Sequence, residues 1–212
     1  MPSRSPNAAD RLLALADNAL KTLAGGVHAA RPRPLAAAAE LDPAARRDAA
    51  RVLRADHAAE VCSQALYQGQ AWTARDAALR AHFALAARDA CDHLAWCDQR
   101  LRELGAAPSP LNPLWYATAL GAGLLAGRVA AGRASLGLAV ETELQAERRL
   151  DADMRRLPPA DSVSRALLEQ MRDDEAARAR AAERLGAQPL PRPLRALMRA
   201  GARLMSAAAG AV

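Results

Sequence analysis

The chain has 212 residues, a formal net charge of +6 and only 3% aromatic side chains. Alanine, leucine and arginine dominate and alternating Val, Ile or Thr is nearly absent, so the composition favours an all-α protein. The basic charge is almost entirely arginine, because Lys21 is the only lysine. No basic cluster is interleaved with aromatic residues, which argues against binding of nucleic acid, whereas a basic surface also suits an anionic membrane.

The cysteines and the N-terminus both indicate a cytosolic protein. Three cysteines are present and form no CxxC motif, so reduced thiols are expected at Cys62, Cys91 and Cys97. The N-terminus lacks the apolar stretch of a signal peptide.

The first 36 residues are predicted to form a helix and a linker. Apolar residues from Leu12 to Leu23 form one stripe, which ends at Gly25-Gly26. Residues 31–36 contain two prolines, which favour an extended chain. We therefore expect residues 1–36 to form an N-terminal helix with a Pro-containing linker, and residues 37–212 to form a second, helical domain.

Four long helices are predicted in the second region, at about residues 43–72, 75–104, 132–157 and 162–186. The first starts at Asp42-Pro43, an N-cap followed by proline at the first helical position. An apolar crossover helix from Asn112 carries no charge before Arg128. Its length, about 17 residues, falls short of the ~20 that span a bilayer, so a buried or interfacial helix is favoured. Four helices with one long crossover are typical of the ferritin-like four-helix bundle.

The C-terminal segment predicts a basic amphipathic helix. One face is apolar and carries Leu194, Leu197, Met198, Leu204 and Met205. Arginines lie on or flank the other side, at positions 192, 195, 199 and 203. Such a helix suits a membrane surface and suits equally a cap on the bundle.

One face of the first core helix carries polar residues where apolar ones are expected. They recur at spacings of three and four and therefore share a helix face: Asp56, His57, Glu60, Gln64 and Tyr67. Burial of a carboxylate or an imidazole is costly unless metal ions or opposite charges replace the lost hydration. The sequence therefore predicts a polar centre inside the bundle.

Motifs along the chain resemble those of the demethoxyubiquinone hydroxylase family of ubiquinone biosynthesis. In chain order they are Arg54-Ala-Asp-His-Ala-Ala-Glu60-Val, Tyr67-Gln-Gly-Gln70, Asp92-His93-Leu-Ala-Trp96, Leu111-Asn-Pro-Leu-Trp-Tyr116, Val140-Glu-Thr-Glu143 and Met171-Arg-Asp-Asp-Glu175. The similarity runs from about residue 10 to the C-terminus. It implies a ferritin-like, membrane-peripheral di-iron monooxygenase that uses O₂ to hydroxylate a prenylated benzoquinol ring.

The resemblance also implies a set of iron ligands, in the order Glu, Glu-x-x-His, Glu, Glu-x-x-His. Four of these positions carry a residue that can bind iron: Glu60, His93, Glu143 and Glu175. Glu141 is an alternative to Glu143 by register. Ala90 stands where the Glu of the first Glu-x-x-His belongs, and Arg178 stands where the second His belongs. Asp89, one turn before His93, is a candidate substitute, and a histidine frequent later on the third helix of the family is here Arg149.

These two replacements predict a changed centre. Alanine offers no donor atom, and a guanidinium has no acceptor lone pair and stays protonated, so neither residue can bind iron. A guanidinium can instead neutralise buried carboxylates through bidentate hydrogen bonds. We therefore expect Arg178 to replace the charge of the metal, in a metal-poor homologue that keeps the bundle and binds a quinone or a membrane.

Two alternatives stay open. One is an active O₂-dependent monooxygenase with an altered iron site, such as a mononuclear site built from Glu60, His93, Glu143 and Asp89. The other is a metal-free membrane adaptor unrelated to quinones.

Expectations about ligands, partners and location follow from the resemblance. Iron is the expected cofactor, with two ions in the family and one or none in this chain. The expected partners are a prenylated benzoquinol, a membrane surface and other proteins of ubiquinone biosynthesis. Tyr67 is a candidate for the quinol pocket, with core packing as its alternative. The expected location is a bacterial-type cytoplasm, peripheral on the inner face of the cell membrane.

Overall fold

The computed structural model describes residues 7–129 and 133–211 and contains seven α-helices over these residues. Their bounds are α1 (Ala8–Leu23), α2 (Pro43–Thr73), α3 (Ala77–Glu103), α4 (Asn112–Val129), α5 (Arg133–Arg156), α6 (Ser162–Arg184) and α7 (Arg192–Ala211). The expected all-α architecture is confirmed. The start expected for the third core helix, residue 132, lies outside the described residues.

Local capping signals explain where the helices begin and end. The Asp42 carboxylate accepts hydrogen bonds from the backbone N–H groups of Ala44 and Ala45 at the start of α2, with proline at the first helical position. Three helices, α1, α3 and α6, are each followed by a glycine with positive φ, at positions 25, 105 and 186. Glycine adopts this left-handed conformation without steric cost, so the helices stop there.

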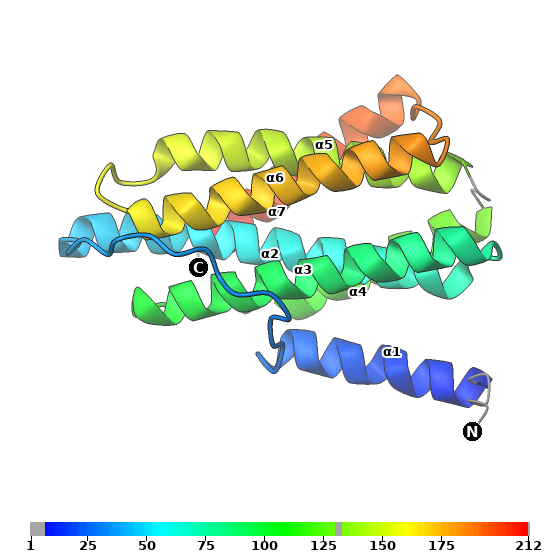
Figure 1. Ribbon diagram of the computed structural model, residues 1–212, viewed down its shortest axis with the longest axis horizontal. Helices are drawn as coiled ribbons and strands as arrows, with labels where there is room; N and C mark the ends of the chain where they lie inside the picture. Colours follow the sequence, from blue (N-terminus) through cyan, green and yellow to red (C-terminus); the bar gives the residue numbers. More distant parts are fainter. Residues whose placement is uncertain (1–6, 130–132, 212) are drawn as a thin grey trace.

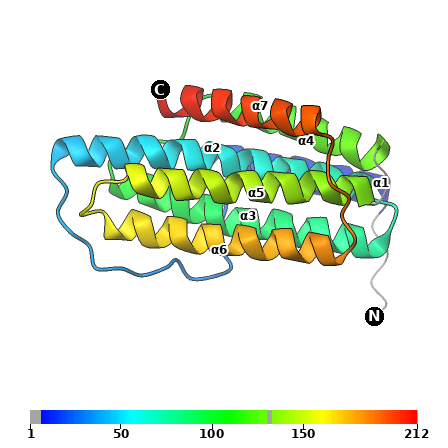
Figure 2. The same cartoon turned by 90° about the horizontal axis from the view of Figure 1, so that it is seen from above.

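The four long helices α2, α3, α5 and α6 form the bundle (Figure 1). Helix α2 packs against α3, and α5 packs against α6. The crossover helix α4 lies along the outside of α2, and α7 packs on α2 as well. Viewed from above, α7 covers one edge of the bundle and α6 lies on the opposite edge (Figure 2). This is the single-crossover arrangement expected of a ferritin-like bundle.

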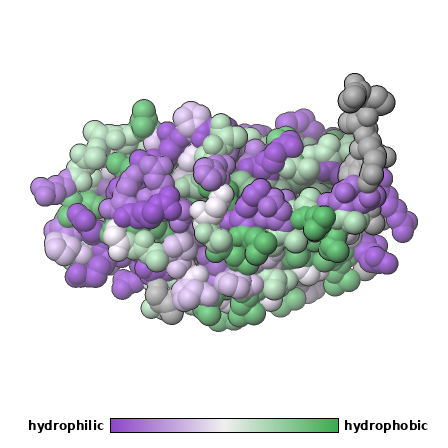
Figure 3. Space-filling model, turned by 90° about the horizontal axis from the view of Figure 1, so that it is seen from below, coloured by the Kyte–Doolittle hydropathy of each residue, from purple (hydrophilic) through white to green (hydrophobic). Residues whose placement is uncertain are grey.

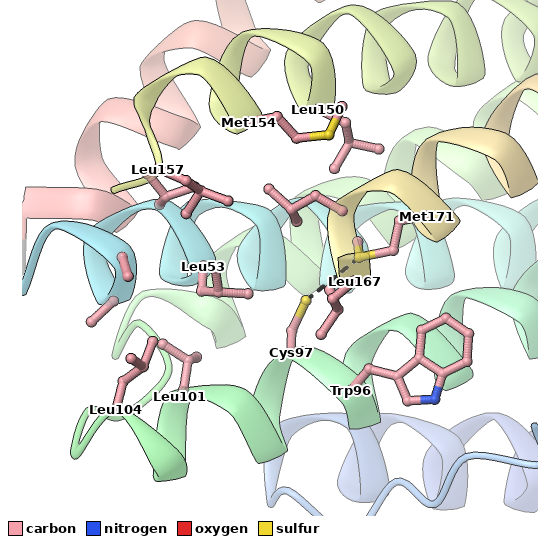
Figure 4. Close-up of a cluster of buried hydrophobic side chains, with 14 of the residues drawn as sticks. Leu53, Trp96, Cys97, Leu101, Leu104, Leu150, Met154, Leu157, Leu167 and Met171 are labelled. Carbon is pink, nitrogen blue, oxygen red and sulfur yellow. Dashed lines mark hydrogen bonds between the residues drawn. The ribbon is translucent and has the colours of Figure 1, made fainter. Parts of the chain in front are cut away.

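The largest apolar cluster joins all four bundle helices at the end where α2 begins (Figure 4). Leu53, Leu101, Leu150 and Leu167 are completely buried in it. The thiol of Cys97 lies 3.8 Å from the Met171 sulfur in the same cluster. Burial of a leucine side chain contributes about 1.5–3 kcal/mol, so this end of the bundle fixes how the four helices are packed.

Helix α4 approaches α2 closely because glycine stands at their crossing. A Cβ atom built on Gly123 would lie 2.2 Å from the Leu66 carbonyl oxygen, closer than any real contact. The outward side of α4 remains apolar and exposes Leu114 and Leu125. Among the described residues, no helix has both the length and the apolar character needed to cross a bilayer.

The segment between α1 and α2 lies along the bundle and is called here the N-terminal strap, residues 27–42 (Figure 1). The Ser162 hydroxyl donates a 2.5 Å hydrogen bond to the Ala37 carbonyl oxygen. The Arg33 guanidinium pairs with the Glu103 carboxylate at 2.8 Å. The strap is therefore fixed both to the start of α6 and to the end of α3.

Candidate metal centre

The four residues that match expected iron ligands come from four different helices and meet inside the bundle. Glu60 lies on α2, His93 on α3, Glu143 on α5 and Glu175 on α6. Each is at most 2% exposed. Three of them offer ligand atoms that lie within 4.8 Å of one another: Glu60, His93 and Glu175.

The His93 ring is held between carboxylates on both sides. Its Nδ1 lies 3.3 Å from Glu60 Oε2 and 3.6 Å from Glu175 Oε1, and its Nε2 lies 3.0 Å from Asp174 Oδ2. Burial disfavours the charged ring, but hydrogen bonds to Asp174, Glu175 and Glu60 outweigh it and raise the pKa of His93 to about 10. Without a metal bound, these carboxylates therefore favour the protonated ring at neutral pH.

The Arg178 guanidinium lies between Glu143 and Glu175. Its Nε donates a 3.1 Å hydrogen bond to Glu143 Oε1, and its Nη2 donates one to Glu175 Oε1. The Tyr67 hydroxyl donates to the same Glu143 oxygen. Burial opposes the guanidinium charge, but the surrounding carboxylates outweigh it and raise the pKa of Arg178. The guanidinium is therefore a permanent cation at the centre.

Two of the six positions that the resemblance assigns to ligands of a pair of iron ions carry residues that cannot bind a metal, Ala90 and Arg178. The Ala90 side chain is completely buried beside the centre and has no donor atom. A fixed cation occupies the position of the second histidine and uses one oxygen each of Glu143 and Glu175. The carboxylates retain some free capacity, since one oxygen of each is buried without a hydrogen-bond partner among the described residues: Glu60 Oε1, Glu143 Oε2 and Glu175 Oε2.

The two other candidate ligands, Glu141 and Asp89, are not grouped with Glu60 and His93. Glu141 accepts a 2.7 Å hydrogen bond from Gln145 and lies 3.7 Å from an Arg199 nitrogen, so it faces α7. Asp89 is half-buried and forms an ion pair with Arg178, with 3.9 Å between its Oδ2 and the Arg178 Nη1. The mononuclear set expected from the sequence used Asp89 and Glu143, whereas the structure groups Glu175 with Glu60 and His93. The assignment of metal ligands stays a prediction.

Tyr67 is part of the centre through Glu143 and part of the core through its ring. Its side chain is completely buried, and the ring stacks on Phe83 with 6.5 Å between centroids. Burial raises the pKa of the hydroxyl, which therefore stays protonated and donates to Glu143. The surroundings of the Tyr67 side chain are those of a core residue. Its place in a quinol pocket stays a prediction.

His57, adjacent to Asp56 on α2, belongs to a different environment. Its Nδ1 lies 3.3 Å from the Asn112 amide nitrogen at the start of α4. Burial lowers the pKa of His57 to about 4, so the ring is neutral at pH 7.

A second buried arginine lies on the other side of Glu60. The Arg149 Nε donates a 2.9 Å hydrogen bond to Asp56 Oδ1, and its Nη2 lies 3.8 Å from Glu60 Oε1. Burial and the neighbouring Asp153 raise the pKa of Asp56 to about 7, although Arg149 opposes this change. The sequence placed Asp56 on the polar helix face and noted Arg149, but it did not predict that the two would pair.

The N-terminal strap completes the centre with a residue that the sequence reasoning missed. Arg31 pairs with Asp92 and with Asp174, both at 2.7 Å, and its guanidinium lies over the Trp96 ring. Asp174 is the same carboxylate that holds His93 Nε2. The sequence did contain a signal for such a residue. Asp92 and Asp174 directly precede His93 and Glu175, and carboxylates near a buried centre need cationic or hydrogen-bonding partners.

The single-crossover bundle and a centre of carboxylates with a histidine from four helices define the ferritin-like class of proteins. A bacterioferritin-related protein from Bacteroides fragilis, described as a dodecameric thioferritin, shows the same fold. It superposes with a TM-score of 0.57 over 80% of this chain and 92% of that chain, at 16% sequence identity.

The sequence comparisons identify the family within this class. The family model described as "Ubiquinone biosynthesis protein COQ7" matches residues 47–209. The 3-demethoxyubiquinol 3-hydroxylases of Cupriavidus taiwanensis and Cupriavidus necator are 50% and 51% identical to this chain, each over 94% of this chain and 98% of the relative. That of Polaromonas sp. is 51% identical over 95% of this chain and 97% of the relative. The chain belongs to the COQ7 family of ubiquinone biosynthesis, which confirms the resemblance.

Proposed function

We propose that this chain acts in ubiquinone biosynthesis as a metal-poor member of the family, one that keeps the bundle but not the di-iron centre. The observation that carries the proposal is the Arg178 guanidinium, hydrogen-bonded to Glu143 and Glu175 where the resemblance expects a metal ligand. A metal cation would have to enter beside this fixed charge. In this role the chain binds a quinone or another protein of the pathway and does not hydroxylate the ring.

Charge balance supports the proposal. The three buried glutamates face three cationic groups of the chain itself: Arg178, the His93 imidazolium and Arg149. Buried charges are tolerated when they are paired and hydrogen-bonded. Both replacements act in the same direction, because Ala90 removes a negative charge and Arg178 adds a positive one. Each of the three buried glutamates therefore has a cationic group of the chain itself within ion-pair distance, without any metal.

Iron content of the purified chain tests the proposal. The wild type and the Ala90→Glu/Arg178→His variant are loaded with ferrous iron without oxygen, desalted and measured by elemental analysis. We expect no stoichiometric iron in the wild type and about two ions per chain in the variant, the number that a complete ligand set holds. Arg180→His, an exposed position two residues along α6, is the matched control and should bind none. Stoichiometric iron in the wild type would refute the metal-poor assignment.

The buried oxygens without partners favour a second candidate, a demethoxyubiquinol hydroxylase with an altered iron site. Carboxylate oxygens with free acceptor capacity suit a cation, and Glu60, His93 and Glu175 offer ligand atoms within 4.8 Å of one another. In the iron measurement this candidate predicts about one ion in the wild type. It also predicts that Glu60→Gln abolishes the binding.

We also propose that the protein is peripheral on the inner face of a bacterial cell membrane. Exposed leucines on the three helices outside the four-helix bundle support this. They are Leu12, Leu13 and Leu20 on α1, Leu114 and Leu125 on α4, and Leu197 and Leu204 on α7. Seen from below, apolar surface gathers mainly in the lower right of the view (Figure 3). Contiguous exposed apolar surface is typical of membrane or protein contacts, and a prenylated quinol would reach the protein from the bilayer.

A further inference from the structure

Four arginines line a groove at the end of the bundle where α2 begins. The groove has a volume of about 450 Å³ and is called here the arginine groove: Arg46, Arg47, Arg51 and Arg54 on one side, residues 104–107 and Gly210–Ala211 on the other. The segment that follows α3 and the end of α7 therefore form its second wall. The end of α7 lies over the first half of α2 (Figure 2). None of the buried carboxylates of the candidate centre lines this groove.

The charges in the arginine groove are poorly compensated. None of the lining residues is acidic. The side chains of Arg46 and Arg47 make no hydrogen bond or ion pair with any residue that the structure describes. Among the described residues, the Arg51 guanidinium pairs only with the exposed Asp48, at 3.2 Å, and such surface pairs contribute little free energy. Four like charges in one concave surface produce a positive potential that an anion would relieve.

One of the four guanidinium groups is held in place by the groove itself. The Arg54 Nε donates a 2.9 Å hydrogen bond to the Ala107 carbonyl oxygen across the groove, which fixes the side chain in its wall. The aliphatic part of Arg51 packs against Gly210, where a Cβ atom would lie 3.4 Å from the Arg51 Cγ. Arg46 and Arg47 remain exposed at the mouth. The groove thus combines two positioned arginines with two that are free to turn toward a ligand.

The chemistry of the groove selects phosphate as the ligand group. A guanidinium offers parallel N–H donors whose spacing matches two oxygens of a phosphate, and arginine clusters are typical of phosphate recognition. The volume lies in the range of small-molecule sites and exceeds what a single phosphate fills.

We propose that the arginine groove binds a phosphate-bearing anion, either a free diphosphate or the headgroup of an anionic phospholipid. This site is separate from the buried centre and is independent of whether that centre holds metal. The shared phosphate chemistry explains the arginines, and the source of the phosphate is decided by the experiment.

Two binding measurements on the full chain test the proposal. Inorganic pyrophosphate is titrated into the protein at constant ionic strength and followed by calorimetry. Flotation is measured with mixed phosphatidylcholine–phosphatidylglycerol vesicles and with phosphatidylcholine vesicles alone. Both use the wild type, the groove variant Arg46→Gln/Arg47→Gln and the control Arg88→Gln/Arg184→Gln. The control removes the same charge from exposed arginines outside the groove.

The groove variant should weaken binding of the relevant anion by about tenfold or more, whereas the control should stay within about twofold of the wild type. Loss of pyrophosphate binding in the groove variant identifies a free phosphate ligand. Loss confined to the anionic vesicles identifies a lipid headgroup. Equal losses in the two variants would mean that net charge alone is responsible and would overturn the proposal. Absence of binding of both anions to the wild type would overturn it too. Circular dichroism verifies that both variants are folded.

Discussion

Removal of the Arg178 guanidinium should destabilise the protein strongly if this group replaces the metal charge. The side chain is 8% exposed, and the carboxylates that it bonds, Glu143 and Glu175, are 2% and 1% exposed. Breaking a buried ion pair by removing one partner costs about 3–5 kcal/mol, because the other charge is left uncompensated. We therefore expect Arg178→Gln to lower the free energy of unfolding by about this amount.

A double-mutant cycle separates the charge effect from lost packing. Glu175→Gln in the Arg178→Gln background removes the uncompensated charge, so the second substitution should restore part of the stability. The expected coupling between the two positions is about 1–3 kcal/mol. Urea unfolding at neutral pH with a chelator, followed by far-ultraviolet circular dichroism, measures each free energy.

The control for this cycle is Arg51→Gln, which breaks a surface pair with Asp48. The two side chains are 57% and 60% exposed, so the loss should stay below about 1 kcal/mol. The reasoning fails if Arg178→Gln costs no more than the control. It also fails if the cycle shows no coupling, since Arg178 would then contribute packing and not charge.

Two further predictions concern pH and the membrane. His57 is neutral in the folded protein, with a pKa of about 4 against 6.5 when unfolded, so the unfolded state binds more protons between these values. The stability that the neutral His57 ring contributes is therefore present above about pH 6.5 and is lost as the pH falls toward 4. Between pH 7.5 and 5 the free energy of unfolding should fall by about 2 kcal/mol. Urea unfolding of His57→Gln should lack this loss, and an equal pH dependence of the unfolding free energy in both proteins would contradict the assignment. Leu197→Ser/Leu204→Ser should reduce flotation with anionic vesicles several-fold if α7 contacts the bilayer, and Leu85→Ser, an exposed leucine on α3, should not.

The fold could be predicted from the sequence because its signals are local. Asp42-Pro43 at the start of α2 and the glycines after α1, α3 and α6 act within a turn of the helix ends. The expected bounds that fall on described residues therefore agree with the structure to within one or two residues. The crossover was predictable from the absence of charge before Arg128. The division of the chain at residue 36 stays a prediction.

The centre was predictable only in part, because motifs place residues on helices but do not show which charges pair. The convergence of Glu60, His93, Glu143 and Glu175 follows from the family resemblance and a four-helix bundle. Periodicity could not decide between Glu143 and Glu141, which differ by two residues and in the structure face Arg178 and α7 respectively. The pairing of Asp56 with Arg149 joins residues 93 apart in the chain, so no local pattern reports it.

The Arg31 contact of the N-terminal strap also constrains the order of folding. Arg31 and Asp174 are separated by 143 residues, so their ion pair closes a loop that includes most of the chain. Contacts of high sequence separation form slowly, because the entropy of loop closure opposes them until other contacts hold the ends together. During synthesis the strap leaves the ribosome early, but it has no complete binding site until α6 has emerged and packed. The N-terminal segment is therefore among the first parts made and among the last to reach its final place.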